Sequence, residues 1–188
     1  MEWTKFVIII KLSTIRSDIV LYIDVRTLVY FTGKVHGGVL LSLMDKVAYV
    51  TASKHSGAYC VTVSVEGVEF LKPIEVGELV SLKSSVNYVG NSTMIIGMRV
   101  EALNPKTNFL KHTNSCYFTM AAKDENHNLI DVPGLIIENE VQLRRFAEGM
   151  ELKAISLKKR QMLKSDFNHK SIQELKLDLI TSKCKIAF

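Results

Sequence analysis

The clearest helical pattern in the sequence runs from Gly38 to Lys54. Its apolar residues recur at intervals of three and four: Leu40, Leu43, Met44, Val47, Ala48, Val50 and Thr51. This spacing predicts a helix with one buried face, and Gly57 can end it in the left-handed conformation. The polar residues fall mostly on the other side: Ser42, Asp45, Lys46, Tyr49 and Ser53. We therefore expect the second face to line a cleft or an interface.

Segments with strand character surround this helix. At least one strand is expected before it, within Asp18–Val25, where β-branched residues are enriched. Four follow it, at Tyr59–Val65, Glu78–Val89, Met94–Leu103 and Phe109–Lys123. They are separated by a Pro- and Gly-containing link at 70–77, a Gly-Asn hairpin signal at 90–91 and a turn at 104–108, and a turn at 124–128 ends the series. Short loops between long strands predict an antiparallel meander.

The end of the chain has a different composition. Residues 138–165 contain no proline and are rich in Glu, Leu, Lys, Arg and Ala, which predicts a basic C-terminal helix. Beyond it, an amphipathic segment at Ile172–Ile180 is compatible with a helix packed on a neighbour or with a disordered tail. We therefore expect an N-terminal strand region at 1–27, a main domain at 28–137, the basic helix at 138–165 and a tail at 166–188.

Composition narrows the class of protein. With 188 residues, 47% hydrophobic and 23% charged, the chain can form one globular domain with appendages. The net charge of +5 is concentrated late, in Arg144-Arg145 and Lys158-Lys159-Arg160. A basic surface can bind nucleic acid, an anionic surface or a phosphorylated molecule. No aromatic residues interleave with these charges and no nucleic-acid motif occurs, so a solvated helix face is favoured and no nucleic-acid partner is expected.

Neither a membrane span nor a metal site is expected. The apolar runs Phe6–Ile10 and Ile19–Ile23 are far shorter than the roughly 18 residues that span a bilayer. The three cysteines form no C-x-x-C pair and leave one unpaired, which fits a reducing cytoplasm. Four histidines are scattered without metal-ligand spacing: His55, His112, His127 and His169.

A glycine-rich turn, Gly33–Gly38, stands directly before the central helix. The first free N–H groups of a helix carry the positive end of its dipole, and glycine lets a ligand approach closely, so this turn suits an anion or a developing oxyanion. The helix carries the acid Asp45 about two turns further on, roughly 10 to 12 Å along the axis from Gly37.

Seven segments in this order resemble hotdog acyl-CoA thioesterases of the bacterial acyl-CoA hydrolase type, and each half of the brain-type acyl-CoA hydrolase. They are 33–45, 52–57, 61–65, 68–74, 76–80, 86–94 and 114–120, and the similarity runs from about residue 28 to about residue 163. The resemblance implies an α+β hotdog fold, in which an antiparallel sheet wraps a long central helix, with an extra C-terminal helix. It also implies hydrolysis of fatty acyl-CoA to a fatty acid and CoA, without metal or organic cofactor, by a homo-oligomer that is a dimer or a homohexameric trimer of dimers.

The resemblance makes Asp45 the catalytic acid. A carboxylate can activate water as general base or attack the thioester directly, and the backbone N–H of Gly37 or Gly38 can stabilise the oxyanion. Because about 10 Å separates these groups along one helix, a substrate carbonyl meets both only if they come from facing subunits. The active site is therefore expected at a dimer interface.

One position departs from the family pattern. The family usually carries an amide, most often Asn, three residues before Gly33, where this chain has Tyr30. A phenol cannot replace the paired donor and acceptor of an amide. His36 beside an acid also invites comparison with hotdog dehydratases, although a structural role in positioning the backbone is favoured.

CoA-binding residues are expected near the second hairpin. Gly90, Asn91, Ser92 and Thr93 offer N–H groups and hydroxyls, and Lys54 offers a positive charge for the phosphates of CoA. Two alternatives stay open at this point: a catalytically weak protein that binds CoA or a nucleotide, and a hydratase or dehydratase that uses His36 with Asp45.

Overall fold

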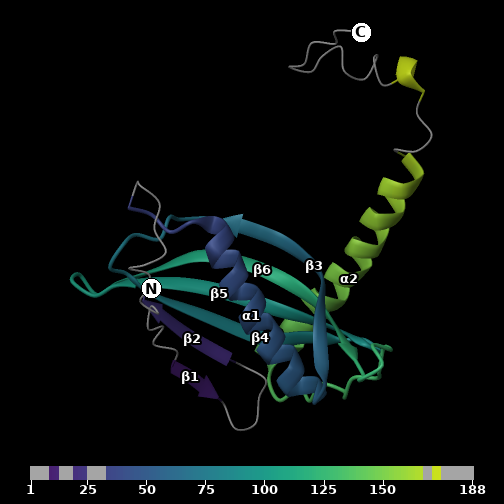
Figure 1. The fold of residues 1–188 in the computed structure, drawn as a ribbon, viewed down its shortest axis with the longest axis horizontal. Helices are drawn as coiled ribbons and strands as arrows, with labels where there is room; N and C mark the ends of the chain where they lie inside the picture. The colour runs from purple at the N-terminus through teal and green to yellow at the C-terminus, as the bar shows by residue number, and fades with distance from the viewer. Residues whose placement is uncertain (1–8, 13–18, 25–32, 167–170, 175–188) are drawn as a thin grey trace. The chain divides into compact units, whose positions relative to one another are not determined.

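The computed structural model describes residues 9–12, 19–24, 33–166 and 171–174 (Figure 1). In order, its elements are β1 (Ile9–Leu12), β2 (Ile19–Asp24), α1 (Gly37–Ser56), β3 (Tyr59–Phe70), β4 (Leu79–Val89), β5 (Thr93–Asn104), β6 (Phe109–Lys123) and α2 (Glu140–Asp166). They belong to two compact units divided between Gly149 and Met150. The first unit contains the sheet, α1 and the start of α2, and the second contains the rest of α2. No helix in the described ranges is long and apolar enough to cross a membrane.

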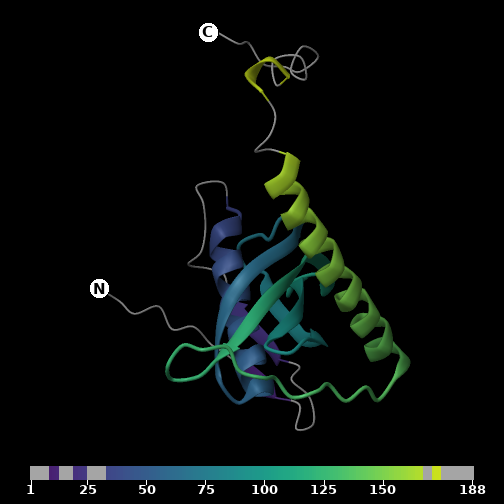
Figure 2. The same cartoon turned by 90° about the vertical axis from the view of Figure 1, so that its right-hand side faces the viewer.

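The strands form an antiparallel sheet in the order β1-β2-β4-β5-β6-β3, counted over the described residues. The predicted meander is thus confirmed for β4, β5 and β6, while β3 pairs with β6 and closes the sheet at one edge. Helix α1 lies across one face and contacts β3, β4, β5 and β6 (Figures 1 and 2). A long helix wrapped by an antiparallel sheet is the hotdog fold, as predicted.

Most predicted boundaries agree with the structure within two residues. The main difference is β3, which extends to Phe70 instead of ending at Val65. Its pairing with β6 shifts register between Thr62 and Ser64 and again between Glu66 and Glu69. These irregularities break the strict alternation that the sequence suggests, so Thr62 and Val63 are both exposed.

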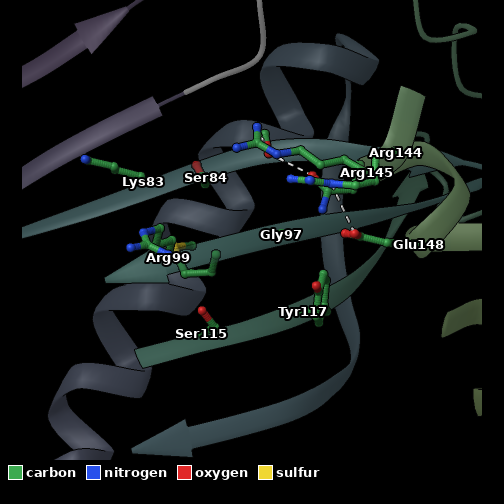
Figure 3. Close-up of a pocket in the computed structure, with 12 residues that line it drawn as sticks. Lys83, Ser84, Gly97, Arg99, Ser115, Tyr117, Arg144, Arg145 and Glu148 are labelled. Carbon is green, nitrogen blue, oxygen red and sulfur yellow. Dashed lines mark hydrogen bonds and ion pairs between the residues drawn. The ribbon is translucent and has the colours of Figure 1, made fainter. Parts of the chain in front are cut away.

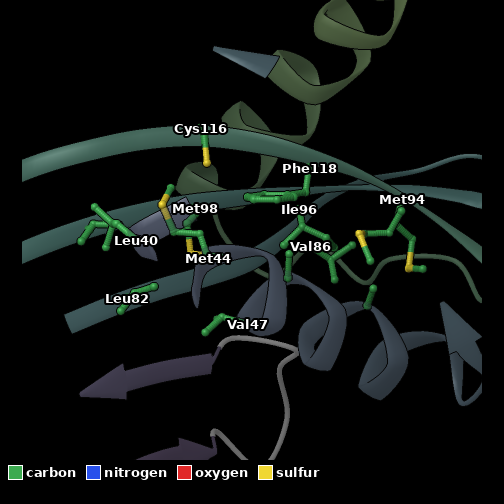
Figure 4. Close-up of a cluster of buried hydrophobic side chains, with 14 of the residues drawn as sticks. Leu40, Met44, Val47, Leu82, Val86, Met94, Ile96, Met98, Cys116 and Phe118 are labelled. Carbon is green, nitrogen blue, oxygen red and sulfur yellow. The ribbon is translucent and has the colours of Figure 1, made fainter. Parts of the chain in front are cut away.

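The core fills the space between α1 and the sheet. Its largest fully buried side chains include Phe118, Met44, Leu82, Met94 and Ile96 (Figure 4). Four buried methionines contribute to it, and their flexible side chains fill the irregular gap between a straight helix and a curved sheet. The methionines are Met44, Met94, Met98 and Met120. The predicted buried face of α1 is confirmed at Leu40, Met44, Val47, Ala48 and Thr51, whereas Val50 is exposed.

Two phenylalanines of β6 provide a matched test of this core. Replacing the fully buried Phe118 by Ala should lower the free energy of unfolding by about 3 to 5 kcal/mol, because it leaves a cavity beneath α1. The same change at Phe109, which is 59% exposed, should cost no more than about 0.5 kcal/mol. Urea unfolding at one fixed protein concentration measures both. Equal losses would show that Phe118 does not belong to the stabilising core.

Candidate active site

The turn before α1 is held by the loop between β3 and β4. The N–H of Val35 donates to the carbonyl of Ile74 at 3.0 Å, and the N–H of Val76 donates to the carbonyl of Gly33 at 3.1 Å. Gly33 has a φ of 73°, in the left-handed region that glycine adopts without strain. The turn therefore has a fixed position relative to residues 74–76.

A buried ion pair anchors this loop in turn. Oε2 of Glu78 accepts the N–H of Glu75 at 2.9 Å, and Oε1 of Glu78 lies 2.8 Å from Nζ of Lys111 on β6. The side chains of Glu78 and Lys111 are only 6% and 12% exposed. Because a buried carboxylate needs a charged partner, this pair ties the loop, and with it the turn, to the sheet.

His36 is the N-cap of α1. Its Nδ1 accepts the N–H of Gly38 at 2.8 Å and the N–H of Val39 at 3.3 Å. The hydrogen-bond geometry thus assigns Nδ1 as the unprotonated ring nitrogen. A Cβ on Gly38 would lie 2.7 Å from Cε1 of His36, so the bare glycine makes room for the capping ring. The N–H of Gly37 takes no part in these contacts and remains a first-turn donor of the helix.

The ring of Phe70, at the end of β3, lies beside this helix start. A Cβ built on Gly37 would lie 3.0 Å from both Cε1 and Cζ of Phe70. Phe70 is itself 55% exposed, so its ring forms an outer wall next to the Gly37 backbone. The structure thus brings Gly37 and Gly38 together with His36, as the sequence order requires, and adds Phe70.

Asp45 lies on α1, half-buried, and contacts the edge strand. Oγ1 of Thr62 on β3 donates a hydrogen bond to Oδ1 of Asp45 at 2.6 Å. Thr62 was not predicted as a site residue, although it stands in one of the segments that carry the family resemblance. The eight residues between Gly37 and Asp45 correspond to about 12 Å of helix, so the turn and the acid of one chain are well separated.

The predicted CoA-binding residues lie at the other end of the sheet. The hairpin at 90–93 joins β4 to β5, and the N–H of Gly90 donates to the carbonyl of Thr93 across the turn. The carbonyls of Asn91 and Ser92 accept the N–H groups of Val132 and Ala122. Lys54 lies in the last turn of α1. The register places Thr93 beside Ala121 and Tyr59 beside Lys123, so the hairpin and the end of α1 share one end of the unit. Tyr30 lies outside the described residues.

The buried cysteines are poor candidates for a nucleophile. Cys60 and Cys116 are free and buried. Burial raises the pKa of the Cys116 thiol to about 12, so this thiol stays protonated at neutral pH. Asp45 is therefore a better placed base or nucleophile than the Cys116 thiol.

A long central helix wrapped by an antiparallel sheet places the chain in the class of hotdog proteins. The model of the thioesterase superfamily matches residues 32–108. The protein VdlD of Helicobacter pylori is 44% identical over 144 residues, which cover 77% of this chain and 81% of VdlD. The chain therefore belongs to the thioesterase superfamily.

Solved structures agree with this assignment. An acyl-CoA hydrolase from Staphylococcus aureus, in complex with butyryl coenzyme A, coenzyme A and coenzyme A disulfide, matches with a TM-score of 0.71 and 27% identity over 79% of this chain and 94% of that one. An apo hexameric acyl-CoA thioesterase matches with a TM-score of 0.74 and 29% identity over 79% of this chain and 95% of that one.

The positions substituted in three variants of the staphylococcal enzyme have the same spacing as three positions of this chain. In separate structures an asparagine, an aspartate or a threonine is replaced by alanine. The aspartate and the threonine are 17 positions apart, as are Asp45 and Thr62. The asparagine precedes the aspartate by 15 positions, and Tyr30 precedes Asp45 by the same interval.

The cap at His36 leads to a stability prediction. Replacing His36 by Ala should lower the free energy of unfolding by about 1 kcal/mol, because the N–H groups of Gly38 and Val39 lose their acceptor. Replacing it by Asn, a good N-cap residue, should restore most of that loss. Urea unfolding of the three proteins makes the comparison. If the Ala and Asn variants were equally stable, the side chain would not act as a cap.

Proposed function

We propose that the chain hydrolyses acyl-CoA thioesters to a carboxylic acid and CoA, with Asp45 as general base or nucleophile. The observation that carries the proposal is the 2.6 Å hydrogen bond from Thr62 to Oδ1 of the half-buried Asp45. It fixes one carboxylate oxygen and leaves Oδ2 for a water molecule or the thioester carbon. The family to which the chain belongs supplies the class of substrate.

The reaction needs two groups of the protein: a base that activates water and a donor that stabilises the oxyanion. In the general-base route, Asp45 takes a proton from water, the resulting hydroxide adds to the thioester carbonyl, and a tetrahedral oxyanion forms. The C–S bond then breaks, CoA leaves as a thiolate, and the proton returns from Asp45 to the products. The N–H of Gly37 is the better oxyanion donor, since the N–H of Gly38 already donates to His36.

We further propose that each site is shared by two chains. Asp45 and Gly37 of one chain are about 12 Å apart along α1, too far to meet one carbonyl. The strand that holds Thr62 is the edge of the sheet, and its Val63 and Val65 are 47% and 36% exposed. An open edge with exposed β-branched residues suits pairing with a second copy. A hexameric structural neighbour supports a dimer or a trimer of dimers.

The same proposal assigns the remaining predicted residues. Lys54 and the hairpin residues Gly90, Asn91, Ser92 and Thr93 share one end of the unit and would contact the CoA portion of the substrate. The relative solved with coenzyme A supports CoA as that ligand. The free cysteines Cys60 and Cys116 support the cytoplasm as the compartment.

One specific observation favours a second candidate function. Tyr30 occupies the position that spacing assigns to the asparagine replaced in the staphylococcal variant. A chain without that amide could bind CoA or a nucleotide while hydrolysing slowly. Such a protein would be stabilised thermally by CoA and would show negligible turnover. The hydratase alternative loses support because Nδ1 of His36 is occupied as a cap acceptor.

Replacing Asp45 by Asn tests the primary proposal. It preserves the shape of the side chain and removes the base, so kcat should fall at least about 100-fold on acyl-CoA esters. Thr62→Val removes only the hydrogen bond to Asp45 and should give a smaller decrease. Release of free thiol from a panel of acyl-CoA esters measures both. If Asp45→Asn hydrolysed these esters like the wild type, Asp45 would not be the catalytic acid.

Gly37→Pro tests the oxyanion donor and the shared site together. Proline fits the first position of a helix, and the φ of −69° and ψ of 128° at His36 suit a residue before proline. The variant lacks the N–H and should lose about 100-fold in kcat, whereas Gly37→Ala adds a Cβ against Phe70 but keeps the donor.

Co-expression of Asp45→Asn with Gly37→Pro should then restore activity. In a mixed dimer one shared site carries both changes and the other carries neither, so half of the sites in isolated mixed dimers should be intact, which is about a quarter of all sites before isolation. Two different affinity tags isolate the mixed species. If the mixed dimers stayed inactive while each parent was folded, the two groups would not meet across subunits.

A further inference from the structure

A hollow lies on the face of the sheet opposite α1 (Figure 3). It has a volume of about 330 Å³ and is lined by β4, β5, β6 and the first turns of α2, all within the first unit. Alternation along the strands explains its position. Leu82, Val100 and Phe118 belong to the core beneath α1, while their neighbours Lys83, Arg99 and Tyr117 line the hollow.

The start of α2 completes this hollow. The ring of Phe146 packs on that of Tyr88, with centroids 5.1 Å apart, and Gly149 is buried against Tyr88. This contact fixes the first turns of the helix and directs Arg144, Arg145 and Glu148 toward the hollow (Figure 3). The basic residues that the sequence suggests as a solvated helix face therefore include two that line a concave site.

The charge of the lining is positive. Lys83 and Arg99 both bind the carboxylate of Glu101, whose side chain is 9% exposed, and the hydrogen bond from Lys83 is the main cause that lowers the pKa of Glu101. Arg144 pairs with Glu148 at a long 3.5 Å. Nη1 of Arg145 lies 3.5 Å from Oγ of Ser85, a weak contact with a neutral group. The half-buried guanidinium of Arg145 thus lacks a carboxylate partner among the described residues.

The floor of the hollow presents a buried donor. Asn87 is 5% exposed, and its Oδ1 accepts a hydrogen bond from Oγ of Ser85 at 2.7 Å. Its Nδ2 lies next to Gly97 and is the atom that an added Cβ there would approach most closely. A Cβ at Gly97 would overlap with this amide, so the glycine is what allows Asn87 to lie in the floor. Because Asn87 lines the hollow, its amide can donate a hydrogen bond to an acceptor bound there.

The hydroxyl of Tyr117 adds another donor. Burial raises the pKa of Tyr117, and the charge of Glu148 acts in the same direction, so the phenol keeps its proton at neutral pH. The hollow thus combines amide, phenol and guanidinium donors with a net positive charge. This set of groups suits a compact anion with several acceptor oxygens.

We propose that this hollow, formed by Asn87, Gly97, Tyr117, Arg144 and Arg145, binds a phosphate-bearing anion. The sheet separates it from Asp45 of the same chain, so it is a second site in addition to the one that cleaves the thioester. Two sources can supply the phosphate: the phosphates of a CoA held by a neighbouring subunit, and a free phosphorylated effector. Their shared chemistry is a phosphate or pyrophosphate group between Arg145 and the amide of Asn87.

Pyrophosphate is the probe that tests the site on the full-length protein. Isothermal titration calorimetry should detect saturable binding to the wild type at physiological salt. Arg145→Met, which removes the charge but keeps the length, should weaken binding at least about 10-fold, the effect of losing one charged hydrogen-bond partner. Asn87→Asp keeps the acceptor for Ser85 but places a negative charge in the floor, and it should weaken binding as much. Arg160→Met, the same charge change on the exposed part of α2, should bind like the wild type.

A binding assay keeps this proposal separate from the proposed hydrolase activity, since it requires no turnover. If the wild type does not bind pyrophosphate, or if Arg145→Met and Asn87→Asp bind it as well as the wild type while folded by circular dichroism, the proposal is wrong. If binding is lost in both variants, kinetics distinguish the source. A raised KM for acyl-CoA, but not for an acyl thioester of N-acetylcysteamine, identifies the phosphates of CoA. An unchanged KM for both identifies a free effector.

Discussion

The packing of α1 against the concave face of the sheet is the constraint on which the rest of the molecule depends. The buried side of the helix, with Met44 and Val47 beneath Phe118, fixes its rotation about its own axis. That rotation directs Asp45 toward β3, where Thr62 binds it. The start of the helix is fixed independently, because the turn at 33–36 bonds to residues 74–76 and Glu78 anchors that loop on Lys111. The core thus positions the acid, and a polar network positions the backbone donors.

Much of this fold could be predicted from local patterns. The helix from Gly38 to Lys54 carries its period, its capping glycine and its buried face in adjacent residues, so its limits were predicted within two positions. The strands from Leu79 to Lys123 are joined by short turns, which fix both their order and their pairing. The place of β3 in the sheet could not be predicted in the same way, because β3 pairs with residues of β6 that lie 44 to 64 positions further along the chain. Its register shifts depend on contacts with β6 that no local pattern reports.

The residues of the candidate site likewise differ in whether a local pattern could predict them. Asp45 and the glycines of the turn could be predicted as site residues because they stand in one continuous segment with a recognisable spacing. Thr62 was missed because its role depends on a contact made 17 positions away, between a helix and a strand. The capping role of His36 follows from the conformation of the turn, whereas the sequence alone could only weigh it against an acid-base role. The hollow was missed for a similar reason, since Arg145 and Asn87 are brought together only when α2 packs on β4.

The two proposed sites therefore use opposite faces of the same strands. Along β5 and β6, one set of side chains buries α1 and supports Asp45, while the alternate set lines the hollow. A displacement of these strands would move both sets, because neighbouring residues of a strand share one backbone. An anion bound between Arg145 and Asn87 would stiffen β4 directly beside Ser84, which bonds to Thr51 on α1 at 2.6 Å. Occupancy of the hollow is thus linked by one strand to the helix that carries the proposed catalytic acid.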